Sequence, residues 1–376
     1  MKIVIAGGGT GGHLFPALAL ADEFKRRDGS TEIIFVGSER GFEKRIVPSY
    51  GYPLETLDVE GLKKRSGFGR LKAVFKAARA TLKAFSLLRR LRPNGVIGSG
   101  SYSSGPAVLA ASLLGIKTAI LEQNALPGLT NRILGRFVDR IYIAFEEAQG
   151  YFKRGNVMVT GNPVRRDILN AMEEKRTNGE KRFSLLVFGG SQGAAAVNAA
   201  FLDAVEYLTD IWGSIKVTHQ TGKEGYGQVE SAYKRKGLKV ELFSFITDMA
   251  KAYSACDMVV CRAGATSIAE MTALGLPSIL VPYPFSTDGH QEVNAKTLAD
   301  KGAAVVLSQD ALTGSTLAGT IRRFFDNPLE LKKMKDAAKT LARPRAAETI
   351  ADDYMKLLGG NPSVRRPQHI AKGFIN

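Results

Sequence analysis

Residues 2–21 read "KIVIAGGGTGGHLFPALALA", and this stretch predicts how the chain begins to fold. The apolar run at 3–5 is typical of a buried strand, and the run of alanine and leucine from Ala17 is typical of a helix. The glycines between them permit a tight turn and a close approach of the backbone to an anion. The stretch therefore predicts a strand, a glycine loop and a helix start, the opening unit of a parallel α/β sheet.

The loop also fits the pattern G-x-G-x-x-G through Gly7, Gly9 and Gly12, which by itself indicates a dinucleotide site only weakly. Such a site also needs an acidic residue near the end of the second strand. After the strand predicted at 33–36, the acid Glu39 comes late and in a turn. NAD is therefore disfavoured, while another phosphate or no charged ligand at all stays open.

His13 stands where the glycine loop meets the helix. An imidazole titrates near neutrality and can accept a proton there, so one interpretation is a catalytic base. The alternative is a residue that only caps or packs the start of the helix. The stretch does not decide between them.

The 376 residues are too many for one ordinary core and predict two domains. The absence of an 18-residue apolar run predicts no membrane-spanning helix, and the N-terminus predicts no secretory segment. Cys256 and Cys261 lie in an apolar stretch and are predicted to be buried thiols. The four histidines do not cluster at ligand spacing, so no metal site is predicted.

The net charge of +16 raises the question of an anionic partner, although solubility alone is another explanation. Residues 63–92 are dense in Lys and Arg, and no acid occurs between Gly61 and Leu121. Here apolar residues recur at helical spacing, while basic residues occupy mostly other faces of the same helix. The apolar set is Leu71, Val74, Phe75, Ala78, Leu82 and Phe85, and the basic set is Lys72, Lys76, Arg79, Lys83, Arg89 and Arg90. This pattern favours a helix that rests on an anionic membrane. The alternative is a surface helix whose apolar stripe faces the core. No nucleic-acid motif is present, so nucleic acid is not predicted.

Strand-like runs alternate with helical stretches along the rest of the chain. The runs lie at 95–98, 118–121, 140–143, 157–160, 184–188, 215–219, 239–243, 257–261, 278–282 and 304–307. The run at 184–188 leads into a second glycine loop, "GGSQGAAAVN". Two such starts predict two doubly wound Rossmann-like domains, each with its ligands outside the carboxyl ends of the strands, facing one cleft.

Three further stretches carry candidate chemistry. Glu270, in "CRAGATSIAEMTALGLPSILVPYP", is either a helix cap or an acceptor for two ribose hydroxyls. Arg165, in "GNPVR", either neutralises a leaving diphosphate or is an interdomain surface residue. Gln291 and Asn294 either bind sugar hydroxyls or cap a helix. No Asp-x-Asp pair is present to hold a divalent metal against a nucleotide diphosphate.

Six ordered motifs resemble those of one family. They are "GGTGGHLFPALALA", "EQNALPGLTNR", "VTGNPVR", "LLVFGGSQGA", "CRAGATSIAE" and "DGHQEVNA", and the chain resembles the MurG family of bacterial peptidoglycan N-acetylglucosaminyltransferases over residues 1–358. The resemblance implies the GT-B fold. It implies an acceptor- and membrane-facing domain at 1–163, a UDP-GlcNAc-binding domain at 164–340 and a helix at 341–358 that crosses back. The tail at 359–376 lies outside it.

The resemblance also implies the site residues. The implied donor contacts are Thr10, Gly11, Gly12, Asn124, Arg165, Ser191, Ile246, Ala265, Thr266, Glu270 and Gln291. Ile246 would hold the uracil through its backbone and Glu270 would hold the ribose. His13, Tyr102 and Glu122 would lie on the acceptor side, with His13 either the base or a cationic contact to the diphosphate. The chain departs from relatives at Leu121, where some carry histidine, and at His290, where others carry glutamine.

The implied reaction is an inverting transfer of N-acetylglucosamine from UDP-GlcNAc to lipid I, undecaprenyl-diphospho-MurNAc-pentapeptide, which forms lipid II without a cofactor. The implied location is the cytoplasmic face of the inner membrane, as a peripheral protein. Two alternatives stay open: a soluble UDP-sugar 2-epimerase, which shares the fold but has no use for the basic helix, and a nucleotide-binding regulator without chemistry.

Overall fold

The computed structural model describes residues 1–39, 41–57, 68–153, 156–171, 182–190 and 192–360, and for residues 68–76 the backbone alone. The strands are β1 (Lys2–Ala6), β2 (Glu32–Ser38), β3 (Leu54–Leu57), β4 (Gly95–Gly98), β5 (Lys117–Glu122), β6 (Arg140–Ile143), β7 (Asn156–Val159), β8 (Phe183–Phe188), β9 (Ile215–Gln220), β10 (Glu241–Phe243), β11 (Met258–Cys261), β12 (Ser278–Leu280) and β13 (Val305–Val306). The α-helices are α1 (Gly11–Arg27), α2 (Glu43–Ser49), α3 (Phe68–Leu91), α4 (Ser104–Leu113), α5 (Leu129–Leu134), α6 (Arg166–Asn170), α7 (Ala195–Ala204), α8 (Tyr226–Arg235), α9 (Met249–Ser254), α10 (Ala265–Leu274), α11 (His290–Ala299), α12 (Gly314–Asp326), α13 (Pro328–Thr340) and α14 (Ala346–Leu357). Short 3₁₀ helices are η1 (Glu146–Tyr151), η2 (Val205–Tyr207), η3 (Trp212–Ser214), η4 (Thr287–Gly289) and η5 (Gln309–Ala311).

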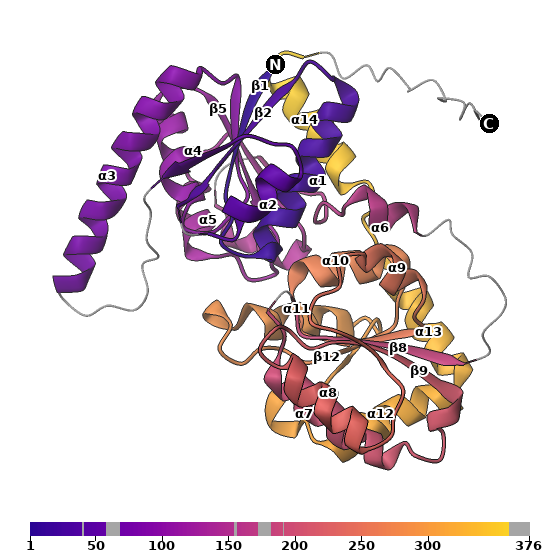
Figure 1. The fold of residues 1–376 in the computed structure, drawn as a ribbon. Coiled ribbons are helices and arrows are strands. Elements are labelled where there is room, and N and C mark those ends of the chain that lie inside the picture. Colours follow the sequence, from indigo (N-terminus) through magenta and orange to yellow (C-terminus); the bar gives the residue numbers. More distant parts are fainter. Residues whose placement is uncertain (40, 58–67, 154–155, 172–181, 191, 361–376) are drawn as a thin grey trace, which may run out of the picture.

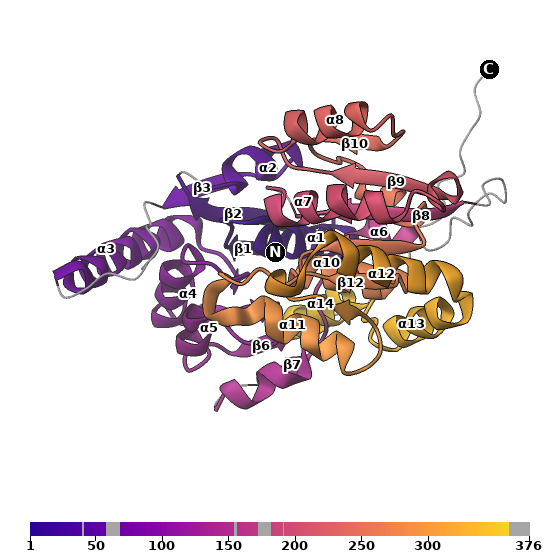
Figure 2. The same cartoon turned by 90° about the horizontal axis from the view of Figure 1, so that it is seen from below.

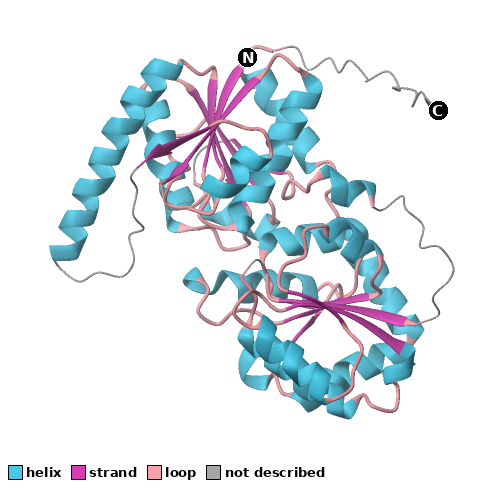
Figure 3. Ribbon diagram, in the orientation of Figure 1, coloured by secondary structure: helices cyan, strands magenta, loops and turns pink. Residues whose placement is uncertain are grey.

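The strands form two fully parallel sheets, each in its own domain (Figure 1, Figure 3). The strand order is β3-β2-β1-β4-β5-β6-β7 in the first sheet and β10-β9-β8-β11-β12-β13 in the second. In both sheets the order reverses beside the strand that leads into a glycine loop, β1 or β8, so each sheet is doubly wound. The predicted class of two Rossmann-like domains is confirmed. The edge strand β3 was not predicted, because its short and half-exposed sequence carries no apolar run.

Helices cover both faces of each sheet, as the alternation along β1 illustrates. Ile3 and Ile5 pack against α1, α2 and α14, whereas Val4 and Ala6 point to the opposite face, against α3, α4 and α5. In the second domain α7, α8 and α12 cover one face, and α6, α9, α10 and α11 cover the other. The thiols of Cys256 and Cys261 are both buried, as predicted, and no disulfide joins them.

The last helix of the described residues, α14, follows the second domain in sequence but packs against the first (Figure 1). The Tyr354 hydroxyl donates to the Lys117 carbonyl at 2.9 Å, and Asp353 accepts from the Tyr142 hydroxyl at 2.8 Å and from Arg140 at 2.7 Å. These contacts tie the end of the described chain to β5 and β6. The two domains are therefore joined by two crossings of the chain, one after β7 and one before α14.

The basic helix α3 lies at the outer edge of the first domain in both views (Figure 1, Figure 2). Ala80, Ala84 and Leu88 form its buried face, while Leu82, from the apolar set noted in the sequence, is 72% exposed. Of the described part of that set, Ala78 and Leu82 are exposed, whereas Phe85 is half-buried and packs against the core. Residues 63–67, the side chains of Lys72 and Lys76, and the tail from 361 lie outside the described residues. Within the described part of the chain, no helix is long and apolar enough to cross a membrane.

Candidate functional site

The first glycine loop delivers His13 to the carboxyl end of the first sheet. The loop follows β1, and α1 begins at Gly11 with Thr10 as its N-cap residue. The half-buried His13 ring places Nδ1 3.0 Å from Gln123 Oε1 and 3.1 Å from the Ser99 carbonyl oxygen. His13 therefore does not cap the helix; its ring reaches across to the ends of β4 and β5.

Those two contacts define the tautomer of His13. A carbonyl oxygen can only accept, and Gln123 Nε2 also donates to Ser99 O at 2.8 Å, which leaves Gln123 Oε1 facing the ring. We therefore assign the ring proton to Nδ1, and Nε2 keeps an unshared electron pair. Burial lowers the pKa of the His13 imidazole, while its bonds to Gln123 and Ser99 act in the opposite direction. The ring fits because residue 100 is glycine, where a Cβ would lie 2.6 Å from Nδ1.

Glu122 precedes Gln123 in the chain, and its carboxylate accepts hydrogen bonds from the loop that follows β5. Its Oε1 accepts from the Asn124 N–H at 3.0 Å, and its Oε2 accepts from Gly128 N–H at 3.1 Å and Asn131 Nδ2 at 2.9 Å. Burial raises the pKa of the carboxyl against these hydrogen bonds. Glu122 thus fixes the loop between β5 and α5. Tyr102, after β4, is 43% exposed.

The two domains meet directly at the first glycine loop. Thr266 Oγ1, near the start of α10, donates to the Gly12 carbonyl at 2.9 Å. From α11, Asn294 Oδ1 accepts from the Ala125 N–H at 2.9 Å, and its Nδ2 lies 3.2 Å from Asn124 Oδ1. Predicted donor contacts from both domains are therefore neighbours at this junction.

Asn294 corrects a prediction. It is fully buried inside α11, so it neither caps a helix nor presents its amide to a sugar. Its side chain instead joins the two domains through the Ala125 backbone N–H and the Asn124 side chain. Gln291, one turn earlier, behaves differently, because its Oε1 accepts from the Tyr283 N–H at 3.0 Å and the residue is only partly buried.

A buried charged group lies on α10 behind this junction. Glu270 is the sixth residue of the helix, so the helix-cap interpretation is wrong. Its carboxylate accepts from the Tyr253 hydroxyl at 3.1 Å and lies 3.9 Å from an Arg165 nitrogen. Burial raises the pKa of Glu270 to about 7, although Arg165 and Tyr253 lower it.

Arg165 connects this buried carboxylate to the first domain. Its guanidinium lies 4.9 Å from the centre of the Phe15 ring on α1, and Nη1 donates to the Tyr50 hydroxyl at 3.4 Å. Asp167 is a second acidic neighbour at 3.5 Å. Neither Phe15 nor Tyr50 was predicted as a site residue, although Phe15 stands inside the quoted motif "GGTGGHLFPALALA".

Two further predicted donor residues follow strands of the second sheet, Ile246 after β10 and Ala265 after β11. The Ile246 N–H donates to Gln220 Oε1 at 2.9 Å, and Ile246 and Ala265 are both buried. Ser191 lies outside the described residues. Gln123 was missed as a site residue, although it stands inside the quoted motif "EQNALPGLTNR". In the described ranges, no group of three or more His, Cys, Asp or Glu side chains could hold a metal ion.

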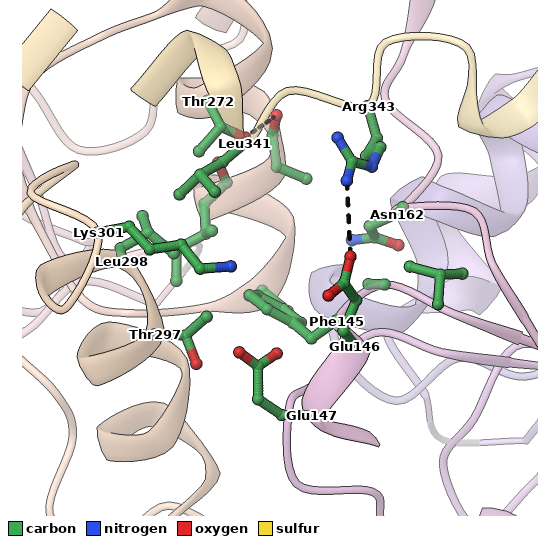
Figure 4. Close-up of a pocket in the computed structure, with 16 residues that line it drawn as sticks. Phe145, Glu146, Glu147, Asn162, Thr272, Thr297, Leu298, Lys301, Leu341 and Arg343 are labelled. Carbon is green, nitrogen blue, oxygen red and sulfur yellow. Dashed lines mark hydrogen bonds and ion pairs between the residues drawn. The ribbon is translucent and has the colours of Figure 1, made fainter. Parts of the chain in front are cut away.

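A separate cavity of about 70 Å³ lies on another face of α10, between the two chain crossings (Figure 4). Its walls include Phe145, Asn162, Ile268 and Lys301, and an Arg343–Glu146 ion pair of 3.9 Å closes one side. Ala265 is the one predicted site residue that lines it. The predicted site and this cavity therefore share Ala265 at the start of α10, whereas Thr266 and Glu270 do not line the cavity.

Two family models and several full-length relatives match this chain, and they indicate the same family. Residues 3–143 match the glycosyltransferase family 28 N-terminal domain, and residues 184–350 match the glycosyltransferase family 28 C-terminal domain. A Myxococcus xanthus protein named UDP-N-acetylglucosamine–N-acetylmuramyl-(pentapeptide) pyrophosphoryl-undecaprenol N-acetylglucosamine transferase is 47% identical, over 98% of this chain and 97% of its own length. A Syntrophus aciditrophicus protein of the same name is 46% identical, over 95% and 99%.

Two solved structures show similar folds. The crystal structure of Acinetobacter baumannii MurG aligns with a TM-score of 0.76 at 31% identity, covering 94% of this chain and 99% of its own. A UDP-N-acetylglucosamine 2-epimerase aligns with a TM-score of 0.68 at 14% identity, covering 97% and 98%. The second likeness concerns the fold alone.

Proposed function

This chain belongs to glycosyltransferase family 28, among the N-acetylglucosaminyltransferases just described, and from that premise we propose how its residues perform the reaction. The protein transfers N-acetylglucosamine from UDP-N-acetylglucosamine to lipid I, and the product is lipid II, a precursor of peptidoglycan. The proposal assigns acceptor binding and the base to residues 1–163 and donor binding to residues 164–340, with 341–358 crossing back.

In this proposal His13 is the general base. The acceptor hydroxyl oxygen attacks the anomeric carbon and its proton passes to His13 Nε2, while the bond to the UDP oxygen breaks and UDP leaves with the electron pair. A positioned base typically contributes about 10²–10⁴-fold to the rate. The observation that carries this role is the contact of Nδ1 with Ser99 O and Gln123 Oε1, because it leaves Nε2 as the proton acceptor. Glu122 is less suited, since its loop uses both of its oxygens.

The donor is proposed to lie along α10 and α11. Glu270 would accept two ribose hydroxyls, Ile246 would hold the uracil through its backbone, and Gln291 would bind the sugar. Arg165 would offset charge on the leaving diphosphate, and its nearness to Glu270 supports a place beside the nucleotide. The proposed donor set is completed by Thr10, Gly11, Gly12, Asn124, Ser191, Ala265 and Thr266.

The acceptor carries a lipid, so we expect the first domain to touch a membrane. Tyr102 is proposed to line the acceptor side. On α3, Leu82, Arg79 and Lys83 are exposed together, while a different stripe packs against the core. An exposed apolar residue among cations is typical of a helix on an anionic lipid surface. We therefore expect a peripheral protein at the cytoplasmic face of the inner membrane.

The proposal is tested with the full chain, UDP-GlcNAc and a short-chain polyprenyl lipid I analogue. UDP release should require the acceptor, and the product should be a disaccharide with a β-1,4 bond. Conversion of the UDP-sugar without an acceptor would instead indicate an epimerase, and UDP-GlcNAc binding without any turnover would indicate a regulator. Either result would contradict the proposed function.

The role of His13 is tested through the pH dependence of kcat at saturating donor. Because burial lowers the pKa of His13 from its ordinary value of 6.5, a base should give a rate that rises with pH through a midpoint below that value and then levels off. His13→Asn and His13→Ala should abolish this acidic limb and lower kcat by about 10²-fold or more, with UDP binding kept. A limb that survives in either variant would exclude His13 as the base. A rate that falls through the same range would indicate a cationic contact to the diphosphate.

A further inference from the structure

Glu43, the first residue of α2, is a fully buried acid outside every motif noted in the sequence. Its Oε2 accepts from the Gly9 N–H at 2.6 Å, and its Oε1 accepts from the Ser38 N–H at 2.7 Å and the Ser38 hydroxyl at 2.9 Å. A buried carboxylate is costly unless donors satisfy it. Three donors, from the glycine loop and the end of β2, converge on this one.

The surrounding backbone leaves room for this side chain on three sides. A Cβ at Gly8 would lie 2.3 Å from Glu43 Cδ, one at Gly37 would lie 2.5 Å from Cγ, and one at Gly41 would lie 2.1 Å from Oε1. Real Cβ atoms do not come this close to non-bonded heavy atoms, so any side chain at these positions would displace the carboxylate. Three glycines from three different segments therefore make one site for Glu43.

The Gly9 N–H has a specific consequence for the loop. In a phosphate-binding loop such a backbone donor points at the bound anion. Here an internal carboxylate takes it, so the Gly9 N–H is not available to a substrate diphosphate. The contact holds the backbone immediately before Thr10, the N-cap residue of α1.

We propose that Glu43 is a positioning residue for the transfer reaction, which fixes the glycine loop so that His13 and the Gly12 carbonyl face the second domain. This inference rests on the proposed function. The Gly12 carbonyl accepts from Thr266, so the loop backbone that Glu43 holds is also the backbone that meets the donor domain. Misplacement of a catalytic group by about 1 Å can cost about 10²-fold in rate. Glu43 acts on the rate through the loop and touches no substrate.

The first test is Glu43→Gln, which keeps the size but turns one acceptor into a donor. The amide N–H would then face either the Gly9 donor or the Ser38 donors. We expect kcat to fall by about tenfold or more. The affinity for UDP should stay within about twofold, because its proposed uracil and ribose contacts, Ile246 and Glu270, lie in the second domain. The matched control is Glu55→Gln, an exposed acid on β3 that pairs with Arg90, and its kinetics should match the wild type. Wild-type kcat in Glu43→Gln would overturn the inference, as would parallel losses of melting temperature and UDP binding.

The second test is a double-mutant cycle with Gly37→Ala. Gly37 lies in β2 without a positive φ, and all three of the nearest atoms that its Cβ would meet belong to Glu43. Gly37→Ala should therefore lower kcat in the wild type but change it less than about twofold in a Glu43→Ala background. Equal losses in both backgrounds would overturn the inference. Absence of product from the wild type would overturn the proposed function and this inference together, whereas normal product with unchanged variants would overturn the inference alone.

Discussion

The buried carboxyl of Glu270 makes stability depend on pH, and Glu270→Gln isolates that dependence. Burial on α10 raises its pKa from 4.5 to about 7, against the lowering effects of Arg165 and Tyr253. Because the folded pKa is raised, the fold favours the protonated acid. Its contribution to the free energy of unfolding is complete below pH 4.5 and is lost as the pH rises through about 7.

The size of the effect follows from the shift. At about 1.4 kcal/mol per pKa unit, the rise corresponds to about 3 kcal/mol of unfolding free energy that the wild type loses and Glu270→Gln does not. The assay is urea unfolding of both proteins from pH 4.5 to 8, with Glu241→Gln as the control. Glu241 is 53% exposed and pairs with Lys216, so its replacement should leave the pH dependence unchanged.

The same titration should appear in donor binding. A carboxylate accepts two ribose hydroxyls better than a protonated acid, so the affinity of the wild type for UDP-GlcNAc should rise with pH through about 7, and that of Glu270→Gln should stay flat. If the stability difference between wild type and variant does not change with pH, the reasoning about burial is refuted. If only the binding curve stays flat, Glu270 does not hold the ribose.

Two further outcomes are expected. The double variant Arg79→Glu, Lys83→Glu should bind vesicles of anionic lipid more weakly by about 1 kcal/mol per residue, as measured by sedimentation, and the control Lys332→Glu on α13 should bind as the wild type does. Equal sedimentation of the wild type with anionic and neutral vesicles would exclude membrane contact through α3. Asn294→Ala should lower the free energy of unfolding by about 1–3 kcal/mol, because the buried Ala125 N–H loses its acceptor, and it should raise the donor KM. Unfolding curves and kinetics that match the wild type would show that this interdomain contact contributes nothing.

The sequence by itself determined the arrangement of the two sheets. Apolar runs at strand spacing, helices between them and the glycine loops after β1 and β8 are local patterns, and local patterns set the order of elements. Parallel strands joined through helices then have few topologies available, and both glycine loops must lie at carboxyl ends of strands. The edge strand β3 was not predicted, because its half-exposed residues form no apolar run.

Only the tertiary structure decided what the individual side chains do. The tautomer of His13 depends on Gln123, 110 positions away, and the role of Asn294 depends on Ala125, 169 positions away. Helical periodicity placed apolar residues on α3 but could not show that Ala84 and Leu88 face the core while Leu82 faces outward. Which donor a buried group meets is set by packing between segments far apart in the chain, and no periodicity within one segment encodes it.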